Sequence, residues 1–103
     1  MDKPSIKLGK KTFFPPSPKM KVWREYLSFF EADKSDMDMK SFLDEHVRLI
    51  TVAFDNPEVT VATIDENMEV ADIVPLTREI FRWVQSMTFS KLAEIPNEEA
   101  EKD

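Results

Sequence analysis

Bulky apolar side chains recur every three to four residues along most of the chain after residue 18. Between about 18 and 33 this spacing places them on one face, which predicts a first helix. A second stripe predicts another helix from about 38 to 54, capped by Asp36 or Asp38. The run Asp55-Asn56-Pro57 should end it, because the residue before a proline avoids helical angles. Thr60 is then expected to cap a short third helix.

The longest periodic segment runs from Val70 to Leu92 and contains Pro75. A proline inside a helix removes one backbone hydrogen bond and clashes with the preceding turn. We therefore favour a separate turn around 70–73 and a main helix that starts at Pro75, over a single kinked helix. The apolar stripe of this segment consists of Leu76, Ile80, Trp83, Val84 and Met87.

The first 17 residues follow a different pattern. Polar and apolar residues alternate over 5–8, Gly9-Lys10 suits a tight turn, and residues 12–14 read as a returning strand. A proline-rich stretch follows, in which Ser17 is the expected helix cap and Pro18 the first helical residue. The predicted fold is mainly α: three to four helices over 18–92, an N-terminal β-hairpin or extended arm over 1–17, and a disordered acidic tail over 93–103.

Composition excludes several kinds of chemistry. The 103 residues include one Gly, one His and no Cys. A single glycine cannot build a phosphate-cradling loop, and the absence of cysteine removes disulfides, thiolate nucleophiles and cysteine metal sites. The formal net charge of −6 disfavours binding to nucleic acid, and no apolar run is long enough to span a membrane. We expect no enzyme activity, no metal and no cofactor.

Three candidate sites have simpler explanations. The stretch from Asp33 to Asp44 resembles a calcium loop, but Met37 occupies a position that needs an oxygen ligand and Asp38 one that needs glycine. His46 lies on an apolar stripe and is interpreted as a packing or boundary residue. The acidic pairs at 44–45 and 65–66 are interpreted as solvated helix faces rather than acid–base catalysts.

Aromatic and methionine side chains are the most informative candidates. Most residues in such stripes belong to a core, yet the first and last helices are apolar over more than one face. Met20, Met37, Met39 and Met87 could help form a partner-binding groove, since methionine adapts to varied surfaces. Along one side of the last helix lie Arg78, Arg82 and Lys91, with Arg78 and Arg82 one turn apart. Their default interpretation is solvated charges with local ion pairs, and the alternative is a binding strip. The predicted partner-binding residues are Trp23, Tyr26, Phe30, Phe81, Trp83, Met87, Arg78 and Arg82.

The order of these features resembles the small tail assembly chaperones of long-tailed bacteriophages and prophages of Gram-positive bacteria. The resemblance covers roughly residues 5 to 85 and consists of structural motifs rather than catalytic ones. The motifs are Lys7-Leu8-Gly9-Lys10-Lys11-Thr12, Met20-Lys21-Val22-Trp23-Arg24, Phe42-Leu43-Asp44-Glu45, the run from Ala53 to Thr60, Ile64-Asp65-Glu66, Pro75-Leu76-Thr77-Arg78-Glu79-Ile80 and Trp83-Val84.

The resemblance implies a helical protein that binds the tape measure protein, keeps it soluble and helps the tail tube protein assemble around it. It also implies a location in the host bacterial cytoplasm and absence from the mature virion. A longer form made by translational frameshifting is common among such proteins. We expect a homo-oligomer, formed through the N-terminal hairpin. The alternative is a structural virion component, such as a head-tail connector or a minor tail protein.

Overall fold

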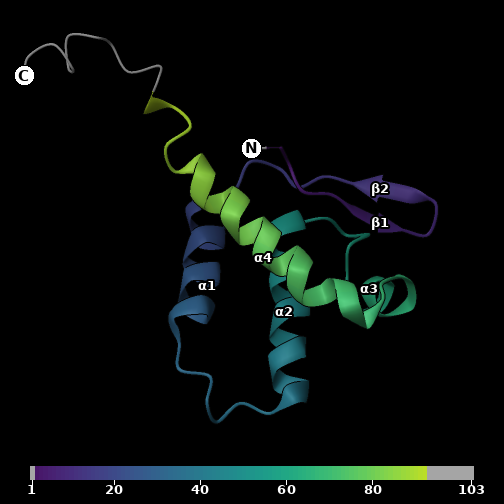
Figure 1. The fold of residues 1–103 in the computed structure, drawn as a ribbon. Helices are drawn as coiled ribbons and strands as arrows, with labels where there is room; N and C mark the ends of the chain where they lie inside the picture. The colour runs from purple at the N-terminus through teal and green to yellow at the C-terminus, as the bar shows by residue number, and fades with distance from the viewer. Residues whose placement is uncertain (1, 93–103) are drawn as a thin grey trace, which may run out of the picture.

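A computed structural model describes residues 2–92 and has a mainly α fold with an N-terminal β-hairpin, as predicted (Figure 1). The acidic tail expected over 93–103 lies outside the described residues. Within residues 2–92 the elements are β1 (Ile6–Leu8), β2 (Lys11–Phe13), α1 (Met20–Glu31), α2 (Met39–Phe54), α3 (Val61–Asn67) and α4 (Val70–Met87).

The hairpin forms at the predicted turn. Gly9 has a φ of 67°, a conformation that suits glycine because it has no Cβ. Lys10 has a negative φ, so the pair matches the turn type with glycine at its first central position. The strands are antiparallel, with Leu8 opposite Lys11 and Ile6 opposite Phe13. Ile6 and Leu8 are buried, so β1 attaches the hairpin to the helices beneath it.

The caps of α2 and α3 are those predicted. Asp38 accepts a hydrogen bond from the backbone N–H of Ser41 at 2.8 Å, which satisfies one free donor of α2. Thr60 and Thr63 cap α3 reciprocally. The first helix differs from the prediction: α1 begins at Met20, and the N-cap is Lys19, which makes no side-chain cap bond.

The prediction of a separate helix starting at Pro75 is wrong. Helix α4 runs without interruption from Val70 to Met87, with Pro75 as its sixth residue. Pro75 cannot donate to the carbonyl of Ala71, one turn earlier. Ala71 is exposed, so water can bind the free carbonyl and offset part of the cost of the missing helical bond. Buried Ile73 and Leu76 lie on either side of the proline, so the same apolar stripe crosses it.

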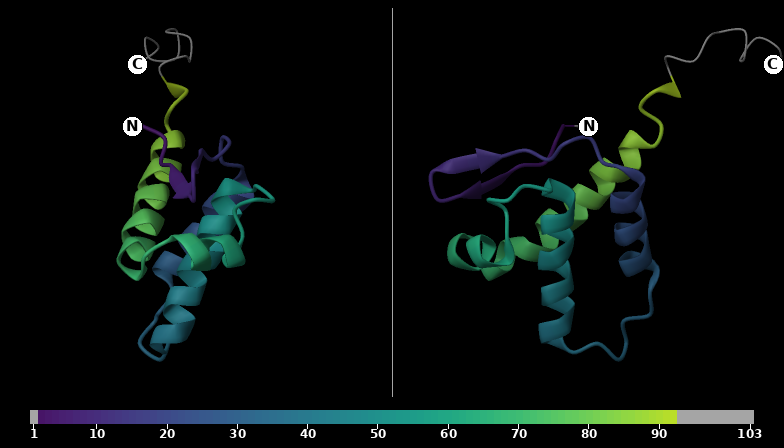
Figure 2. Two further views of the ribbon diagram at one scale, coloured as in Figure 1. Left: turned by 90° about the vertical axis from the view of Figure 1, so that its right-hand side faces the viewer. Right: turned by 180° about the vertical axis from the view of Figure 1, so that it is seen from behind.

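Helix α4 lies across the antiparallel pair formed by α1 and α2 (Figures 1 and 2). Its buried residues Ile80 and Trp83 meet Tyr26 of α1 and Ile50 of α2 in one core. The Tyr26 hydroxyl donates to the carbonyl oxygen of Leu49 at 2.6 Å and so ties α1 to α2. At the edge of the same interface, the Arg48 guanidinium lies 2.9 Å from the Glu25 carboxylate.

Candidate partner-binding surface

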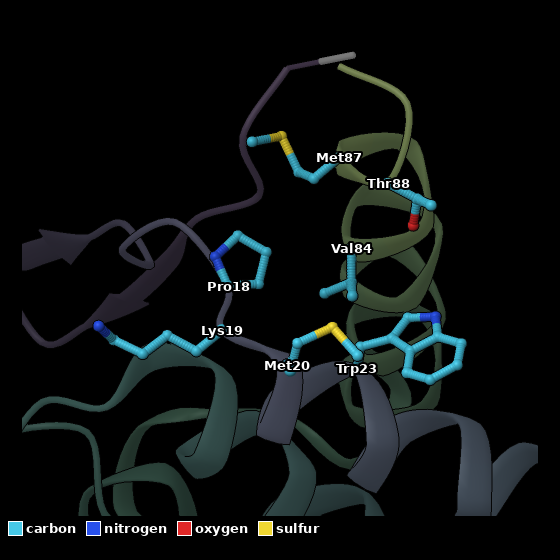
Figure 3. Close-up of a pocket in the computed structure, with 7 residues that line it drawn as sticks. All are labelled: Pro18, Lys19, Met20, Trp23, Val84, Met87 and Thr88. Atoms are coloured by element: carbon cyan, nitrogen blue, oxygen red, sulfur yellow. The ribbon is translucent and has the colours of Figure 1, made fainter. Parts of the chain in front are cut away.

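An apolar groove opens where the start of α1 meets the end of α4 (Figure 3). Its volume is about 410 Å³. Val84, which is almost fully buried, forms part of the floor, and Pro18, Met20 and Met87 surround the opening, while the Lys19 side chain extends away from it. We call this feature the terminal groove. Its lining residues are Pro18, Lys19, Met20, Trp23, Val84, Met87 and Thr88.

Exposed apolar side chains adjoin the terminal groove. Met20, at its rim, is 58% exposed. Phe89 and Leu92, which follow the groove residue Thr88 in the chain, are 66% and 57% exposed. Scattered exposed apolar residues are ordinary, but an exposed apolar residue that lines a concave apolar surface, as Met20 does, is typical of an interaction site. The terminal groove is therefore the strongest candidate for a partner-binding surface.

The structure divides the eight predicted partner-binding residues into three groups. Trp23 and Met87 line the terminal groove and are half-buried. Tyr26 and Trp83 are 0% and 2% exposed, so they pack the core and support the groove from below. A partner cannot reach these two side chains in this conformation.

The other four lie further along α1 and α4. The rings of Phe30 and Phe81 stack with centroids 4.6 Å apart and an interplanar angle of 2°. Both are half-buried between the two helices, so each retains an accessible edge. Arg78 and Arg82 are exposed on α4. They flank Phe81 in the chain and leave a charged border beside the aromatic stack.

Sequence reasoning missed several groove residues. Pro18 and Val84 were assigned to a helix start and a core stripe, and Lys19 and Thr88 carried no signal. Methionine content was the useful signal, because Met20 and Met87 both line the groove.

Two other candidate methionines do not belong to the terminal groove. Met39 is 70% exposed at the start of α2, and Met37 packs partly against the core. The start of α2 lies at the opposite end of the helices from the groove (Figure 1).

His46 is a packing histidine. It is 1% exposed, and its Nδ1–H donates to the carbonyl of Phe42 at 2.7 Å. Its ring lies edge-on to Phe29, with centroids 4.9 Å apart. Burial lowers the pKa of His46, and the positive charges of Arg78 and Lys34 lower it further. His46 is therefore neutral near pH 7 and has no role in the groove.

The oxygens of the calcium-like stretch are turned toward the chain itself. The Asp33 carboxylate accepts from the backbone N–H of Ser35 at 2.9 Å, and this bond lowers the pKa of Asp33. Asp38 is used as the α2 cap. Among the described residues, no three or more His, Cys, Asp or Glu side chains gather in a way that could hold a metal ion. Likewise, no helix in residues 2–92 is long and apolar enough to cross a membrane.

The fold and the terminal groove define a small helical protein with a surface suited to binding other proteins. A family model described as "Phage tail chaperone protein" matches residues 1–103. The chain belongs to this family, which confirms the resemblance seen in its sequence. Its general role is therefore that of a chaperone for phage tail proteins. A search of curated proteins and a search of solved structures each found no match.

Proposed function

We propose that this chaperone binds the tape measure protein during tail assembly, keeps it soluble, and helps recruit the tail tube protein. The terminal groove is the observation that carries the proposal. It is concave and apolar, and exposed Met20 lines it. A very long helical protein that is poorly soluble alone presents apolar helix faces, and a short apolar groove can cover one such face.

The groove chemistry suits a helical client. A helix docks into a groove through apolar anchors on one face, at intervals of three or four residues. Trp23 supplies a large rigid wall, whereas Met20 and Met87 can change rotamer to fit successive, non-identical turns of a long client. Binding through adaptable side chains favours many weak contacts along the client rather than a single tight one.

The contact surface is proposed to extend along α1 and α4 beyond the groove. The stacked rings of Phe30 and Phe81 offer apolar edges, and Arg78 and Arg82 supply charge beside them. Exposed charges of this kind contribute mainly to orientation and to the rate of encounter. In the proposal, buried Tyr26 and Trp83 act indirectly, by holding α1 and α4 in place.

The proposal extends to the setting of the protein. It places the protein in the host bacterial cytoplasm as a homo-oligomer and outside the mature virion, without a catalytic reaction or cofactor. Self-association is assigned to the free edge of β2, because unpaired strand edges readily add another strand. A structural virion component is the alternative, and mass spectrometry of purified particles separates the two. Detection of this chain in stoichiometric amounts in purified virions would support that alternative.

Co-expression with the tape measure protein of the same phage tests the central claim. The wild-type chain should raise the soluble fraction of the client severalfold, and Trp23→Ala and Met87→Ala should each reduce that gain. Met39→Ala is the matched control, because Met39 is an equally apolar and more exposed side chain at the opposite end of the helices. A client that stays insoluble with the wild-type chain, or equal losses for Met39→Ala and Met87→Ala, would contradict the proposal.

A further inference from the structure

A second groove lies on another part of the molecule, beside the free edge of the hairpin. It has a volume of about 400 Å³ and shares no lining residue with the terminal groove. One wall is formed by β1, and the others by the end of α3 and the first half of α4. We call it the strand-edge groove. Its lining residues are Ser5, Ile6, Lys7, Asn67, Met68, Glu69, Asp72, Pro75, Leu76 and Glu79.

The hairpin register shows which backbone groups face this groove. A two-residue turn closes on a hydrogen-bonded pair, which here is Leu8 with Lys11. Pairs alternate along an antiparallel ladder, so Lys7 and Thr12 form the next, non-hydrogen-bonded pair. Their N–H and C=O groups therefore point outward, those of Lys7 from the β1 edge and those of Thr12 from the β2 edge. Within residues 2–92, the Lys7 backbone makes no hydrogen bond to a loop or side chain.

The charged side chains that line the strand-edge groove favour a positively charged ligand. Three carboxylates, from Glu69, Asp72 and Glu79, line the groove against the single ammonium of Lys7. All three acidic residues are exposed, so they remain available to a ligand. Pro75, which also lines the groove, has no backbone N–H and so adds no donor to the walls. The groove is thus rich in acceptors and suits a ligand that carries positive charge and backbone N–H groups.

The shape of the groove favours a single extended segment over a second hairpin. A strand added to β1 would lie roughly 5 Å from it, on the side that faces α4. Residues of α4 form the opposite wall of the groove, and a second copy's hairpin, which is two strands wide, needs more room there than a single strand. A lone extended peptide has no such second strand.

We propose that the strand-edge groove binds an extended, lysine- or arginine-bearing segment of a partner protein, which pairs with β1 as an added strand. Backbone bonds to Lys7 supply the pairing, and basic side chains of the segment meet Asp72 and Glu79. This site is independent of the terminal groove, so the chaperone can hold a helical and an extended segment at the same time.

Titration with short capped peptides tests this proposal on the full-length protein. The expected ligand alternates lysine with valine. One comparison peptide alternates glutamate with valine, and another is the lysine peptide with proline at its centre, which cannot donate to a strand. The lysine–valine peptide should bind, more weakly as salt is raised, and the other two should not. Comparable binding of the glutamate peptide overturns the charge argument, and comparable binding of the proline peptide overturns strand pairing.

Two proline variants locate the binding edge. Lys7→Pro removes an outward N–H but no bond between β1 and β2, and it should weaken the lysine–valine peptide about tenfold, as loss of one or two hydrogen bonds does. Thr12→Pro makes the same change at the β2 edge and should leave the affinity unchanged. Equal effects of the two variants overturn the proposal. The proposal is also overturned if Lys7→Pro abolishes dimers in sedimentation but leaves the affinity for the lysine–valine peptide unchanged. In that case the occupant of the groove would be a second copy of the chain.

Two further variants complete the test even if a proline disturbs the hairpin. The double variant Asp72→Asn with Glu79→Gln keeps both side chains in shape and should weaken the lysine–valine peptide about fivefold. Unchanged affinity of this double variant overturns the proposal. Trp23→Ala, in the terminal groove, should bind the lysine–valine peptide as the wild type does. Loss of client binding at the terminal groove is therefore distinguishable from loss of peptide binding at the strand-edge groove.

Discussion

Replacing Tyr26 with phenylalanine removes one hydroxyl from the centre of the domain and leaves the ring in place. Tyr26 is 0% exposed, and its hydroxyl donates to the Leu49 carbonyl at 2.6 Å. Leu49 lies inside α2, so its carbonyl also belongs to the helical hydrogen-bond ladder and stays bonded in the variant. The expected loss is therefore that of one net hydrogen bond, about 1 kcal/mol, rather than that of an orphaned buried acceptor.

That loss is measurable by thermal and urea unfolding. For a domain near 100 residues, about 1 kcal/mol lowers Tm by roughly 4–8 °C. The urea midpoint should fall while the slope of the transition stays the same, because the surface exposed on unfolding does not change. Since Tyr26 lies beneath the groove rather than in it, solubilisation of the client at a temperature where the variant is folded should be unaffected.

The same residue predicts a response to alkaline pH. Burial raises the pKa of Tyr26 far above its ordinary value of 10.0, although Arg48 opposes the shift. A raised pKa in the folded state means that the contribution of Tyr26 to stability is complete below pH 10 and is lost as the pH rises above 10, when the unfolded chain ionises. Tyr26 is the only tyrosine, so tyrosinate absorbance should rise only together with unfolding.

Two results would refute this reasoning. Equal stability of Tyr26→Phe and the wild type would show that the hydroxyl bond contributes nothing. Ionisation of Tyr26 near its ordinary pKa in the folded protein would show that the side chain is accessible to solvent. Tyr26 would then again be a candidate for direct contact with a partner. Trp23→Ala is the complementary control, since its main effect should be on client binding.

Three further predictions concern single positions. The pKa of His46 is lowered from its ordinary 6.5, so its contribution to the free energy of unfolding should be complete above pH 6.5. Below pH 6.5 the free energy of unfolding should fall by at most about 1.4 kcal/mol per pH unit. His46→Asn should reduce this pH dependence, as measured by urea unfolding at several pH values. Pro75→Ala restores the N–H that the Ala71 carbonyl lacks and should raise the free energy of unfolding by about 1–3 kcal/mol; a lower urea midpoint would contradict the account of α4. Thr60→Ala removes the α3 cap and should cost about 1 kcal/mol, with a smaller loss for Thr60→Ser.

Most of the fold could be predicted because local chemistry determines it. Gly9 allows the positive φ that the hairpin turn needs, and Asp38 and Thr60 carry oxygens that cap a helix. These signals act over a few residues and do not depend on the rest of the fold. The start of the last helix was predicted wrongly, because the free-energy cost of Pro75 inside a helix depends on its surroundings. The exposed Ala71 carbonyl can bind water, and the sequence does not show which carbonyls are exposed.

The candidate site was only partly predictable, because a helical period defines a face but not its neighbour. Trp23 and Tyr26 are three residues apart and share one side of α1, yet Tyr26 is sealed by α2 and α4 while Trp23 reaches the groove. The groove itself joins Pro18 to Val84, which are distant in the chain. The strand-edge groove likewise depends on β1 and α4 lying on opposite sides of it, and no local pattern in the sequence encodes that arrangement.

The unequal burial of the two tryptophans gives the protein a pair of internal optical reporters. Trp83 is 2% exposed in the core, whereas Trp23 stands at the wall of the terminal groove. The intrinsic fluorescence of Trp83 should change on unfolding and be insensitive to small quenchers added to the folded protein. The fluorescence of Trp23 should be reduced by the same quenchers until a client covers its side chain. Single-tryptophan variants can therefore distinguish docking from unfolding in real time, without a label attached to either protein.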